Sequence, residues 1–293
     1  MKTLSLKGCG TALITPFRNG NVDYEAYSRL VERQTTAGIH FLVPLGTTGE
    51  TPCLDENEKI RILEISKELG NGKTIIAGGG TNSLSGTVKS IKLLENHGAD
   101  AFLIVVPYYN KPTQNGLYEY FKAIAEVSDK PVVMYNVPGR TGTNMTAETA
   151  LRLAEIENIV AIKEASGNYS QISEIIRNAP EGFSVLSGND DETLSLMATG
   201  ASGVISVASN IVPELMVSLT EALLHNDMEK ARKLHHRLSP LFKNCFIESN
   251  PIPVKAGLAA INLISNELRL PLTYASEATS VIMQNTLADL GIL

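Results

Sequence analysis

The sequence lacks any apolar segment long enough to cross a membrane. Its longest uninterrupted apolar run covers residues 101–107, whereas a membrane-spanning helix needs about 20 apolar residues. The chain reaches Gly8 and Gly10 before any apolar segment develops, and a secretory signal requires such a segment. We therefore expect a protein that has no membrane partner and resides in the cytoplasm.

An excess of positive charge is also missing. The chain has 25 Lys and Arg against 31 Asp and Glu, which gives a formal charge of −6 at pH 7. No basic stripe could neutralise phosphates, so a nucleic-acid partner is not expected. With 43% hydrophobic and 19% charged residues, the composition is that of a folded globular protein.

Cysteines and histidines are few, and neither has the spacing of metal ligands. Cys9, Cys53 and Cys245 lie far apart and form no C-x-x-C motif, so we interpret them as reduced packing residues. His235 and His236 are adjacent in a Lys/Arg-rich helical pattern and project to different sides. We expect no bound metal.

Short apolar or β-branched segments alternate with amphipathic segments along most of the chain. Nearly all-apolar strands separated by helices predict a parallel sheet covered by helices. Eight such units of roughly 25–30 residues predict an α/β fold, a closed (β/α)8 TIM barrel. An open doubly wound sheet is the alternative, but the first strand-to-helix turn, residues 15–20 (TPFRNG), is no G-x-G-x-x-G. The predicted strands are residues 11–15, 40–45, 74–78, 101–106, 131–135, 159–163, 183–187 and 203–207.

The strand pattern ends near residue 224. Before that point, helix starts are recognisable, for example the capping box that Asp55 forms with Glu58. After it, three helical patterns follow at residues 227–242, 252–264 and 276–290. We therefore predict a catalytic barrel domain over residues 1–224 and a C-terminal three-helix appendage over residues 225–293.

Two polar residues end neighbouring apolar strands. Lys163 ends residues 159–163 (IVAIK) and Tyr135 ends residues 131–135 (PVVMY), at the strand ends where barrels carry their active sites. If Lys163 points inward, desolvation favours its neutral amine, which can form a Schiff base, and Tyr135 could relay protons. The alternatives are a lysine paired with a rim carboxylate such as Glu164 and a core tyrosine whose hydroxyl is bonded to backbone.

Two loop segments have the chemistry of carboxylate sites. Residues 46–50 (GTTGE) follow the second predicted strand and offer the Thr47 and Thr48 hydroxyls with closely spaced backbone N–H groups. Arg140 follows a Pro-Gly turn in residues 136–142 (NVPGRTG), and its planar guanidinium binds carboxylates bidentately. A simple turn and a surface arginine are the alternatives.

The segment after the seventh predicted strand argues against a phosphorylated substrate. Barrels often bind phosphate there, but residues 187–189 (SGN) are followed at once by Asp190 and Asp191. Their carboxylates would repel a phosphate, which favours an enzyme of small carboxylates over a phosphosugar isomerase.

Two adjacent tyrosines follow the fourth predicted strand. Tyr108 and Tyr109 lie in residues 107–112 (PYYNKP), and they cannot both be core residues of one strand face. Paired loop tyrosines are typical of interfaces. We expect at least one of them to contact another subunit.

Together these segments resemble the pyruvate-dependent lyases and aldolases of the dihydrodipicolinate synthase and N-acetylneuraminate lyase superfamily, over essentially the whole chain. Thr47-Thr48 and Arg140 make it most similar to the dihydrodipicolinate synthase branch, because sialic-acid lyases typically have Ser-Thr and lack the arginine. A sugar-acid lyase and a non-catalytic keto-acid-binding barrel are the alternative functions. The motifs are residues 8–12 (GCGTA), 15–17 (TPF), 46–50, 107–112, 135–142, 188–190 (GND), 203–206 (GVIS) and 250–255 (NPIPVK).

The resemblance implies a Schiff-base-forming lyase of the class I aldolase type. It would condense pyruvate with L-aspartate 4-semialdehyde to give 4-hydroxy-tetrahydrodipicolinate, in lysine and diaminopimelate biosynthesis, without a cofactor. In this reading Lys163 forms the Schiff base, and Tyr135, Thr47 and Tyr109 relay protons. The substrate-binding residues would be Thr48 for the pyruvate carboxylate, Arg140 for the semialdehyde carboxylate, and Gly188 and Ile205 lining the pocket.

The resemblance also implies a homo-oligomer, a dimer of dimers, in which Tyr109 crosses to the neighbouring subunit. Relatives inhibited by lysine bind it near residues matching Tyr108 and Asn82, which are present here. They usually have a carboxylate where this chain has Ser85-Gly86, and tend to have a histidine where it has Glu56. We therefore expect weak or absent inhibition by lysine.

Overall fold

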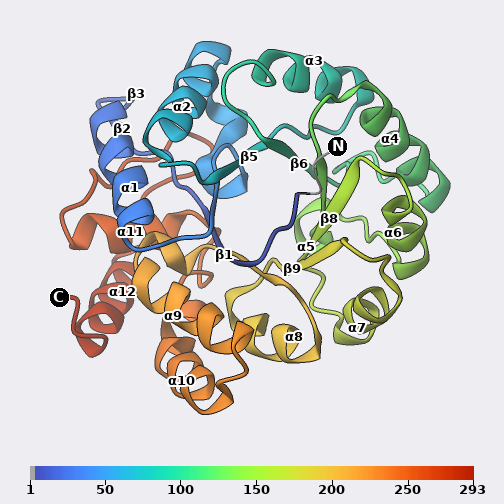
Figure 1. The fold of residues 1–293 in the computed structure, drawn as a ribbon. Helices are drawn as coiled ribbons and strands as arrows, with labels where there is room; N and C mark the ends of the chain where they lie inside the picture. The colour runs from blue at the N-terminus through green and yellow to red at the C-terminus, as the bar shows by residue number, and fades with distance from the viewer. Residues whose placement is uncertain (1–3) are drawn as a thin grey trace.

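Eight parallel strands close into a barrel, as the alternating pattern predicts. The computed structural model describes residues 4–293, and Figure 1 shows the ring of helices around the strands. The order around the barrel is β1-β10-β9-β8-β7-β6-β5-β4, so the (β/α)8 TIM-barrel prediction is confirmed. The strands are β1 Gly8–Ala12, β4 Phe41–Val43, β5 Thr74–Gly78, β6 Ala101–Val105, β7 Val132–Asn136, β8 Ile159–Glu164, β9 Ser184–Ser187 and β10 Gly203–Ser206.

The first strand begins earlier than predicted. Residues 11–15 were expected, but β1 spans Gly8–Ala12, because the two glycines belong to the strand and do not bound it. A Cβ on Gly10 would lie 1.9 Å from the Phe41 ring, so only glycine fits there. Beyond the strand, Ile14 donates its N–H to the Asn210 side chain.

A small hairpin follows that the sequence reading missed. Strands β2 Phe17–Arg18 and β3 Asn21–Val22 pair antiparallel. Asn19 and Gly20 connect them with positive φ values of 52° and 79°, as a two-residue type I′ turn requires. The Asn-Gly pair is a typical hairpin signal, and it lies in residues 15–20, which are predicted only as a strand-to-helix turn.

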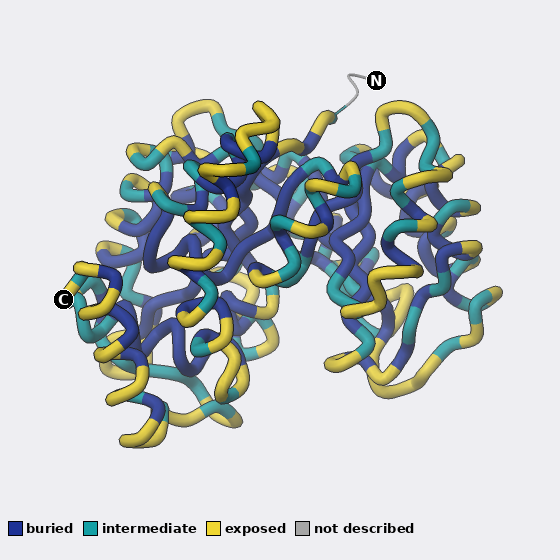
Figure 2. The backbone as a smooth tube through the Cα atoms, turned by 90° about the horizontal axis from the view of Figure 1, so that it is seen from below, coloured by how far each residue is buried: buried dark blue, intermediate teal, exposed yellow. Residues whose placement is uncertain are grey.

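Helices cover the outside of the barrel. Figure 2 shows the central strands buried and the surrounding helices alternating between buried and exposed positions. The Asp55–Glu58 capping box at the start of α2 is present, as predicted. The helices that follow the strands are α1 Tyr24–Thr36, α2 Glu56–Leu69, α3 Leu84–Leu94, α4 Gln114–Val127, α6 Ala147–Ala154, α7 Tyr169–Asn178, α8 Thr193–Thr199 and α9 Pro213–Leu224.

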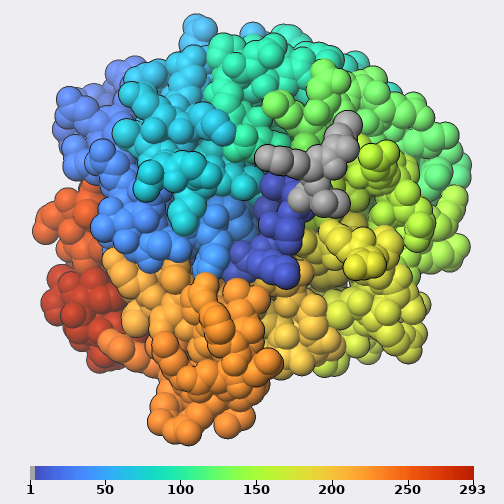
Figure 3. Space-filling view, viewed as in Figure 1, coloured from blue at the N-terminus to red at the C-terminus, as the bar shows by residue number. Residues whose placement is uncertain are grey.

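Period-two alternation separates two hydrophobic clusters. Tyr135 and Ala161 belong to the cluster inside the barrel, whereas Met134 and Ile162 pack outward against the helices. Leu6 is buried in the inner cluster, and on the face shown in Figure 3 the dark blue residues near the start of the described chain lie at the centre of the ring. The inward-facing residues define which polar side chains can reach the barrel interior.

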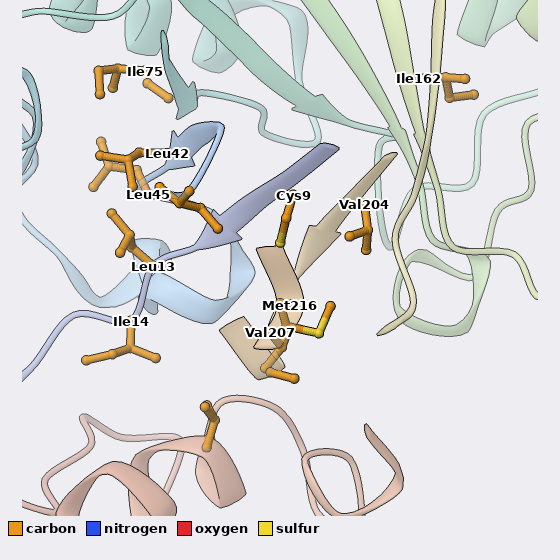
Figure 4. Close-up of a cluster of buried hydrophobic side chains, with 14 of the residues drawn as sticks. Cys9, Leu13, Ile14, Leu42, Leu45, Ile75, Ile162, Val204, Val207 and Met216 are labelled. Atoms are coloured by element: carbon orange, nitrogen blue, oxygen red, sulfur yellow. The ribbon is translucent and has the colours of Figure 1, made fainter. Parts of the chain in front are cut away.

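Three C-terminal helices follow the barrel: α10 Met228–Asn244, α11 Ile252–Ala260 and α12 Glu277–Asp289. They match the three predicted helical patterns, with α11 shorter than the predicted 252–264. One hydrophobic cluster contains residues from before and after position 224 in the sequence. Ile14, Val207 and Met216, which come before it, are labelled in Figure 4. The division into domains at residue 224 stays a prediction.

No helix of residues 4–293 is long and apolar enough to cross a membrane. Among the same residues, no group of three or more His, Cys, Asp or Glu side chains could hold a metal ion. Cys9, Cys53 and Cys245 are free thiols, and Cys9 and Cys245 are buried.

Candidate active site

Lys163 and Tyr135 lie side by side inside the barrel. They are register partners on the adjacent strands β8 and β7, and their exposed fractions are only 6% and 7%. The Lys163 Nζ lies 4.3 Å from the centre of the Tyr135 ring. Within residues 4–293, the Lys163 amine forms no ion pair within 4 Å, so no carboxylate of the described chain occupies it.

Glu164 does not pair with Lys163, which removes the structural alternative for the lysine. Its side chain lies on the other side of β8, where Asn136, Gln171 and the backbone N–H of Ser166 donate to it at 2.8–3.1 Å. Burial raises the pKa of Glu164 above its usual range, and these donors oppose that shift. The network ties the ends of β7 and β8 together behind the lysine.

The loop after β4 presents a buried hydroxyl at the mouth of the barrel. It forms the short helix η1 Thr47–Gly49, in which Thr48 is buried and Thr47 is exposed. The Asn250 Nδ2 donates to the Thr48 Oγ1 at 2.9 Å, and the Thr15 hydroxyl donates to the Gly49 carbonyl at 2.8 Å. The loop is therefore held by residues from both ends of the chain.

A buried ion pair fixes the end of this loop and was missed from the sequence. The Lys255 Nζ donates to Glu50 at 2.6 Å and to the Thr15 carbonyl at 2.9 Å, and both charged side chains are fully buried. Burial lowers the pKa of Lys255, and the neighbouring Glu50 carboxylate opposes that shift. Both residues lie in family motifs, 46–50 and 250–255, but nothing in the sequence shows that their side chains pair.

Arg140 reaches the same region from the loop after β7. It lies in the short helix α5 Pro138–Thr141, and its Nη2 donates to the Asn250 carbonyl at 3.3 Å. Arg140 is exposed at the rim, where its planar cation can meet a carboxylate. Asn250 begins the motif 250–255, but the sequence suggests no role for it. In the structure it contacts both Thr48 and Arg140.

These residues enclose one small cavity. It has a volume of about 50 Å³, which is room for only a few water-sized groups. A Cβ on Gly188 would lie 3.1 Å from the Lys163 Cε and 2.6 Å from the Ala165 Cβ, so glycine keeps space beside the amine. The lining residues are Ala12, Val43, Gly46, Thr47, Thr48, Leu103, Tyr135, Val137, Arg140, Lys163, Ala165, Gly188, Asn189, Val207, Phe246 and Asn250.

Asp190 accepts hydrogen bonds from backbone N–H groups in the region where other barrels bind phosphate. It is 2% exposed, and its Oδ2 accepts the N–H groups of Val207 and Ala208 at 3.0 and 2.9 Å. Burial raises the pKa of Asp190, and these donors oppose the shift. Because these N–H groups already donate to the chain's own carboxylate, they are not free to bind a phosphate.

A family model described as the dihydrodipicolinate synthetase family matches residues 5–290. The chain belongs to the dihydrodipicolinate synthetase family. The match covers the barrel and the C-terminal helices, so the resemblance inferred from the motifs is confirmed over nearly the full length.

Individual members of the family are similar along their whole lengths. The 4-hydroxy-tetrahydrodipicolinate synthase of Thermotoga neapolitana is 48% identical over 98% of this chain and 99% of its own. The crystal structure of dihydrodipicolinate synthase from Thermotoga maritima has a TM-score of 0.97 at 46% identity and covers 99% of this chain and 100% of that one. Dihydrodipicolinate synthase from Acinetobacter baumannii, solved complexed with pyruvate, has a TM-score of 0.96 at 40% identity and covers 99% and 100% of the two chains.

Two of the residues suggested by the family resemblance lie away from the cavity lining. Ile205 is fully buried in the inner hydrophobic cluster with Tyr135, while its neighbour Val207 lines the cavity. Tyr109 is 88% exposed, has a φ of 74°, and donates its N–H to the Thr141 carbonyl at 3.4 Å. Their roles in this family member stay predictions.

The structure describes the surroundings of Glu56 and Gly86, on which the expectation about lysine inhibition depends. Glu56 forms an exposed ion pair with Lys89 at 2.7 Å. A Cβ on Gly86 would lie 2.8 Å from the side-chain oxygens of Ser83 and Thr81, so a larger side chain requires these groups to move.

Proposed function

We propose that this member of the dihydrodipicolinate synthetase family condenses pyruvate with L-aspartate 4-semialdehyde through a Schiff base on Lys163. The product would be 4-hydroxy-tetrahydrodipicolinate, a precursor in lysine and diaminopimelate biosynthesis. The observation that carries the proposal is an unpaired, buried lysine beside Tyr135, in a small cavity that also contains a threonine hydroxyl and an arginine.

The reaction begins at the Lys163 amine. The amine adds to the ketone carbon of pyruvate, and the carbinolamine loses water to form an iminium. Tyr135 and Thr47 accept a proton from the amine and donate a proton to the carbinolamine hydroxyl, which then leaves as water. Thr48 donates a hydrogen bond to the pyruvate carboxylate, which holds the ketone beside the amine.

Carbon–carbon bond formation follows from the same intermediate. Loss of a proton from the pyruvate methyl group gives an enamine, whose carbon attacks the aldehyde of the second substrate. The amine of that substrate then adds to the iminium carbon and displaces Lys163, which closes the ring and regenerates the enzyme. The iminium nitrogen accepts the electron pair during deprotonation, so the chemistry itself requires no metal or organic cofactor.

Arg140 supplies the second carboxylate site in this proposal. Its position at the rim, held against the Asn250 carbonyl, suits the carboxylate of L-aspartate 4-semialdehyde while the aldehyde enters the cavity. Gly188 leaves space beside the amine for the adduct, and Ile205 forms part of the packed wall below it.

We further propose that Tyr109 completes the proton relay of a neighbouring subunit in a dimer of dimers. Its 88% exposure and its neighbour Tyr108, 38% exposed, support an interface there. Co-expressed Lys163→Ala and Tyr109→Phe chains should recover activity in mixed dimers, because one site then has both groups. Inactive mixed dimers would place Tyr109 in its own subunit's site, and full activity of the Tyr109→Phe enzyme alone would place Tyr109 outside catalysis. Sedimentation measures the oligomer.

The substrate pair is tested by a product assay. The enzyme incubated with pyruvate and L-aspartate 4-semialdehyde should form the heterocycle, and incubation with N-acetylneuraminate should release no pyruvate. Release of pyruvate from the sugar acid without condensation would instead identify a sugar-acid lyase on this barrel.

We also propose weak or absent inhibition by lysine and a cytoplasmic location. The Lys89 contact of Glu56 and the missing carboxylate at Gly86 support weak or absent inhibition by lysine. Half-inhibition by submillimolar lysine in a steady-state assay would contradict it. The three free thiols support a cytoplasmic location. Cell fractionation tests this proposal.

A further inference from the structure

Asn250 contacts both groups that the proposed function assigns to the two substrate carboxylates. It lies between α10 and α11, is 4% exposed and lines the cavity. Its side-chain Nδ2 lies 2.9 Å from the Thr48 Oγ1, across 202 residues of sequence. Its backbone carbonyl accepts from the Arg140 Nη2 at 3.3 Å, across 110 residues. No other residue described here hydrogen-bonds to both Thr48 and Arg140.

The direction of the Asn250–Thr48 hydrogen bond has a chemical consequence. An amide nitrogen can only donate, so the Thr48 oxygen accepts and its single hydroxyl proton remains for another partner. A carboxylate can only accept, so a hydroxyl that binds it must donate. A Thr48 hydroxyl oriented by Asn250 is therefore already set to donate to a substrate carboxylate before the substrate arrives.

We propose that Asn250 is a positioning residue whose side chain orients the Thr48 hydroxyl toward the pyruvate carboxylate, while its backbone carbonyl holds Arg140 nearby. This inference rests on the proposed function, because it takes pyruvate as the ligand at Thr48. Preorganised donors bind more tightly, since the enzyme does not have to order them when the substrate enters.

The segment that carries Asn250 is itself firmly held. The Lys255 N–H donates to the Pro251 carbonyl at 3.0 Å, and the Lys255 Nζ is paired with Glu50 at 2.6 Å. Residues 46–50 are thus fixed at Thr48 by Asn250 and at Glu50 by Lys255. The C-terminal segment can therefore position the carboxylate loop of the barrel.

Two substitutions at Asn250 separate orientation from packing. Asn250→Asp keeps the shape but replaces the donor with an acceptor that competes for the Thr48 proton and brings negative charge toward the substrate carboxylate. Asn250→Leu keeps approximately the volume but offers no hydrogen bond. We expect KM for pyruvate to rise about 100-fold in the Asp variant and about 10-fold in the Leu variant, with kcat at saturating pyruvate changed less than KM.

Asn158 provides a matched control at the opposite end of the barrel. It is also a buried asparagine, and its Nδ2 donates to the carbonyls of Ala125 and Ser128 at 3.2 and 2.9 Å, just before β8 begins. Asn158→Leu should lower the thermal midpoint and leave KM for pyruvate within twofold of the wild type.

The test measures KM, kcat and thermal midpoint for the wild type and the three variants. A larger KM in Asn250→Asp than in Asn250→Leu supports the inference, and a wild-type KM in a folded Asn250→Asp enzyme overturns it. If Asn250→Leu does not fold, the isosteric Asp variant decides alone. Failure of the proposed function is distinguishable, because the wild type itself would then not form the heterocycle from pyruvate and the semialdehyde.

Discussion

The two halves of the active site are built in different ways. Lys163 and Tyr135 are placed by strand register, on neighbouring strands joined by a regular parallel ladder. Thr48 and Arg140 lie on loops, and both are held by Asn250 from the C-terminal segment. The contrast teaches that the proposed Schiff-base lysine is positioned by neighbouring strands, whereas the proposed carboxylate sites are positioned by contacts between segments more than 100 residues apart.

Replacing Tyr135 tests the strand half and has the largest expected effect. Tyr135→Phe keeps the ring beside Lys163 but removes the hydroxyl, so kcat should fall roughly 10²- to 10⁴-fold with a smaller change in KM. Steady-state kinetics measures this. Tyr120→Phe is the control, because its hydroxyl bonds to Thr87 and the Thr81 carbonyl in the helix layer; an equal loss of kcat in both variants would contradict the relay.

Breaking the Glu50–Lys255 pair tests the loop half through stability. Either Glu50→Gln or Lys255→Met leaves a buried group without its partner, which should cost about 3–5 kcal/mol of unfolding free energy. The double variant should lose less than the sum of the single losses. Denaturant unfolding measures all three, and strictly additive losses would show that the pair does not act as a unit.

Removing the Arg140 guanidinium should affect one substrate only. Arg140→Leu should raise KM for L-aspartate 4-semialdehyde roughly 10- to 100-fold and leave KM for pyruvate nearly unchanged. Arg152, whose guanidinium lies 4.4 Å from the centre of the Tyr118 ring, is the control, and Arg152→Leu should change neither constant. Equal increases in both KM values for Arg140→Leu would contradict a separate second carboxylate site.

Removing the Arg269–Glu58 ion pair should have the smallest effect, a loss of stability that depends on pH. Arg269 lowers the pKa of Glu58 below its usual range through two hydrogen bonds of 2.7 and 2.6 Å. The stabilisation, about 1 kcal/mol, should therefore be present above the unfolded pKa of about 4.3 and be lost as pH falls through the lowered folded pKa. Thermal midpoints of wild type and Glu58→Gln should differ at pH 7 and converge in acid. A constant difference down to pH 2 would contradict this assignment.

The positions of Lys163 and Tyr135 were predictable from the sequence because the residues next to them along the chain determine where each strand ends. Apolar strands alternate with helices, and residues at strand ends of a barrel face its mouth, so Lys163 and Tyr135 could be named together. The position of β1 was wrong by three residues, because the close approach of Gly10 to Phe41 involves a partner on another strand. No local pattern contains that information.

The loop half was only partly predictable. The types of the residues at positions 47, 48 and 140 suggested carboxylate binding, but their supports did not appear in any short window. Lys255 and Glu50 are 205 residues apart, as Asn250 and Thr48 are 202 residues apart. Such pairs become visible only when the barrel closes and the C-terminal helices pack against it.

The most direct test of the central claim is to reduce the enzyme with borohydride in the presence of pyruvate and map the modified peptide. We predict one reduced pyruvyl adduct on Lys163 in the wild type and none in Lys163→Ala. An adduct on another lysine, or no adduct on a folded wild-type enzyme, would contradict the assignment of Lys163 as the Schiff-base residue.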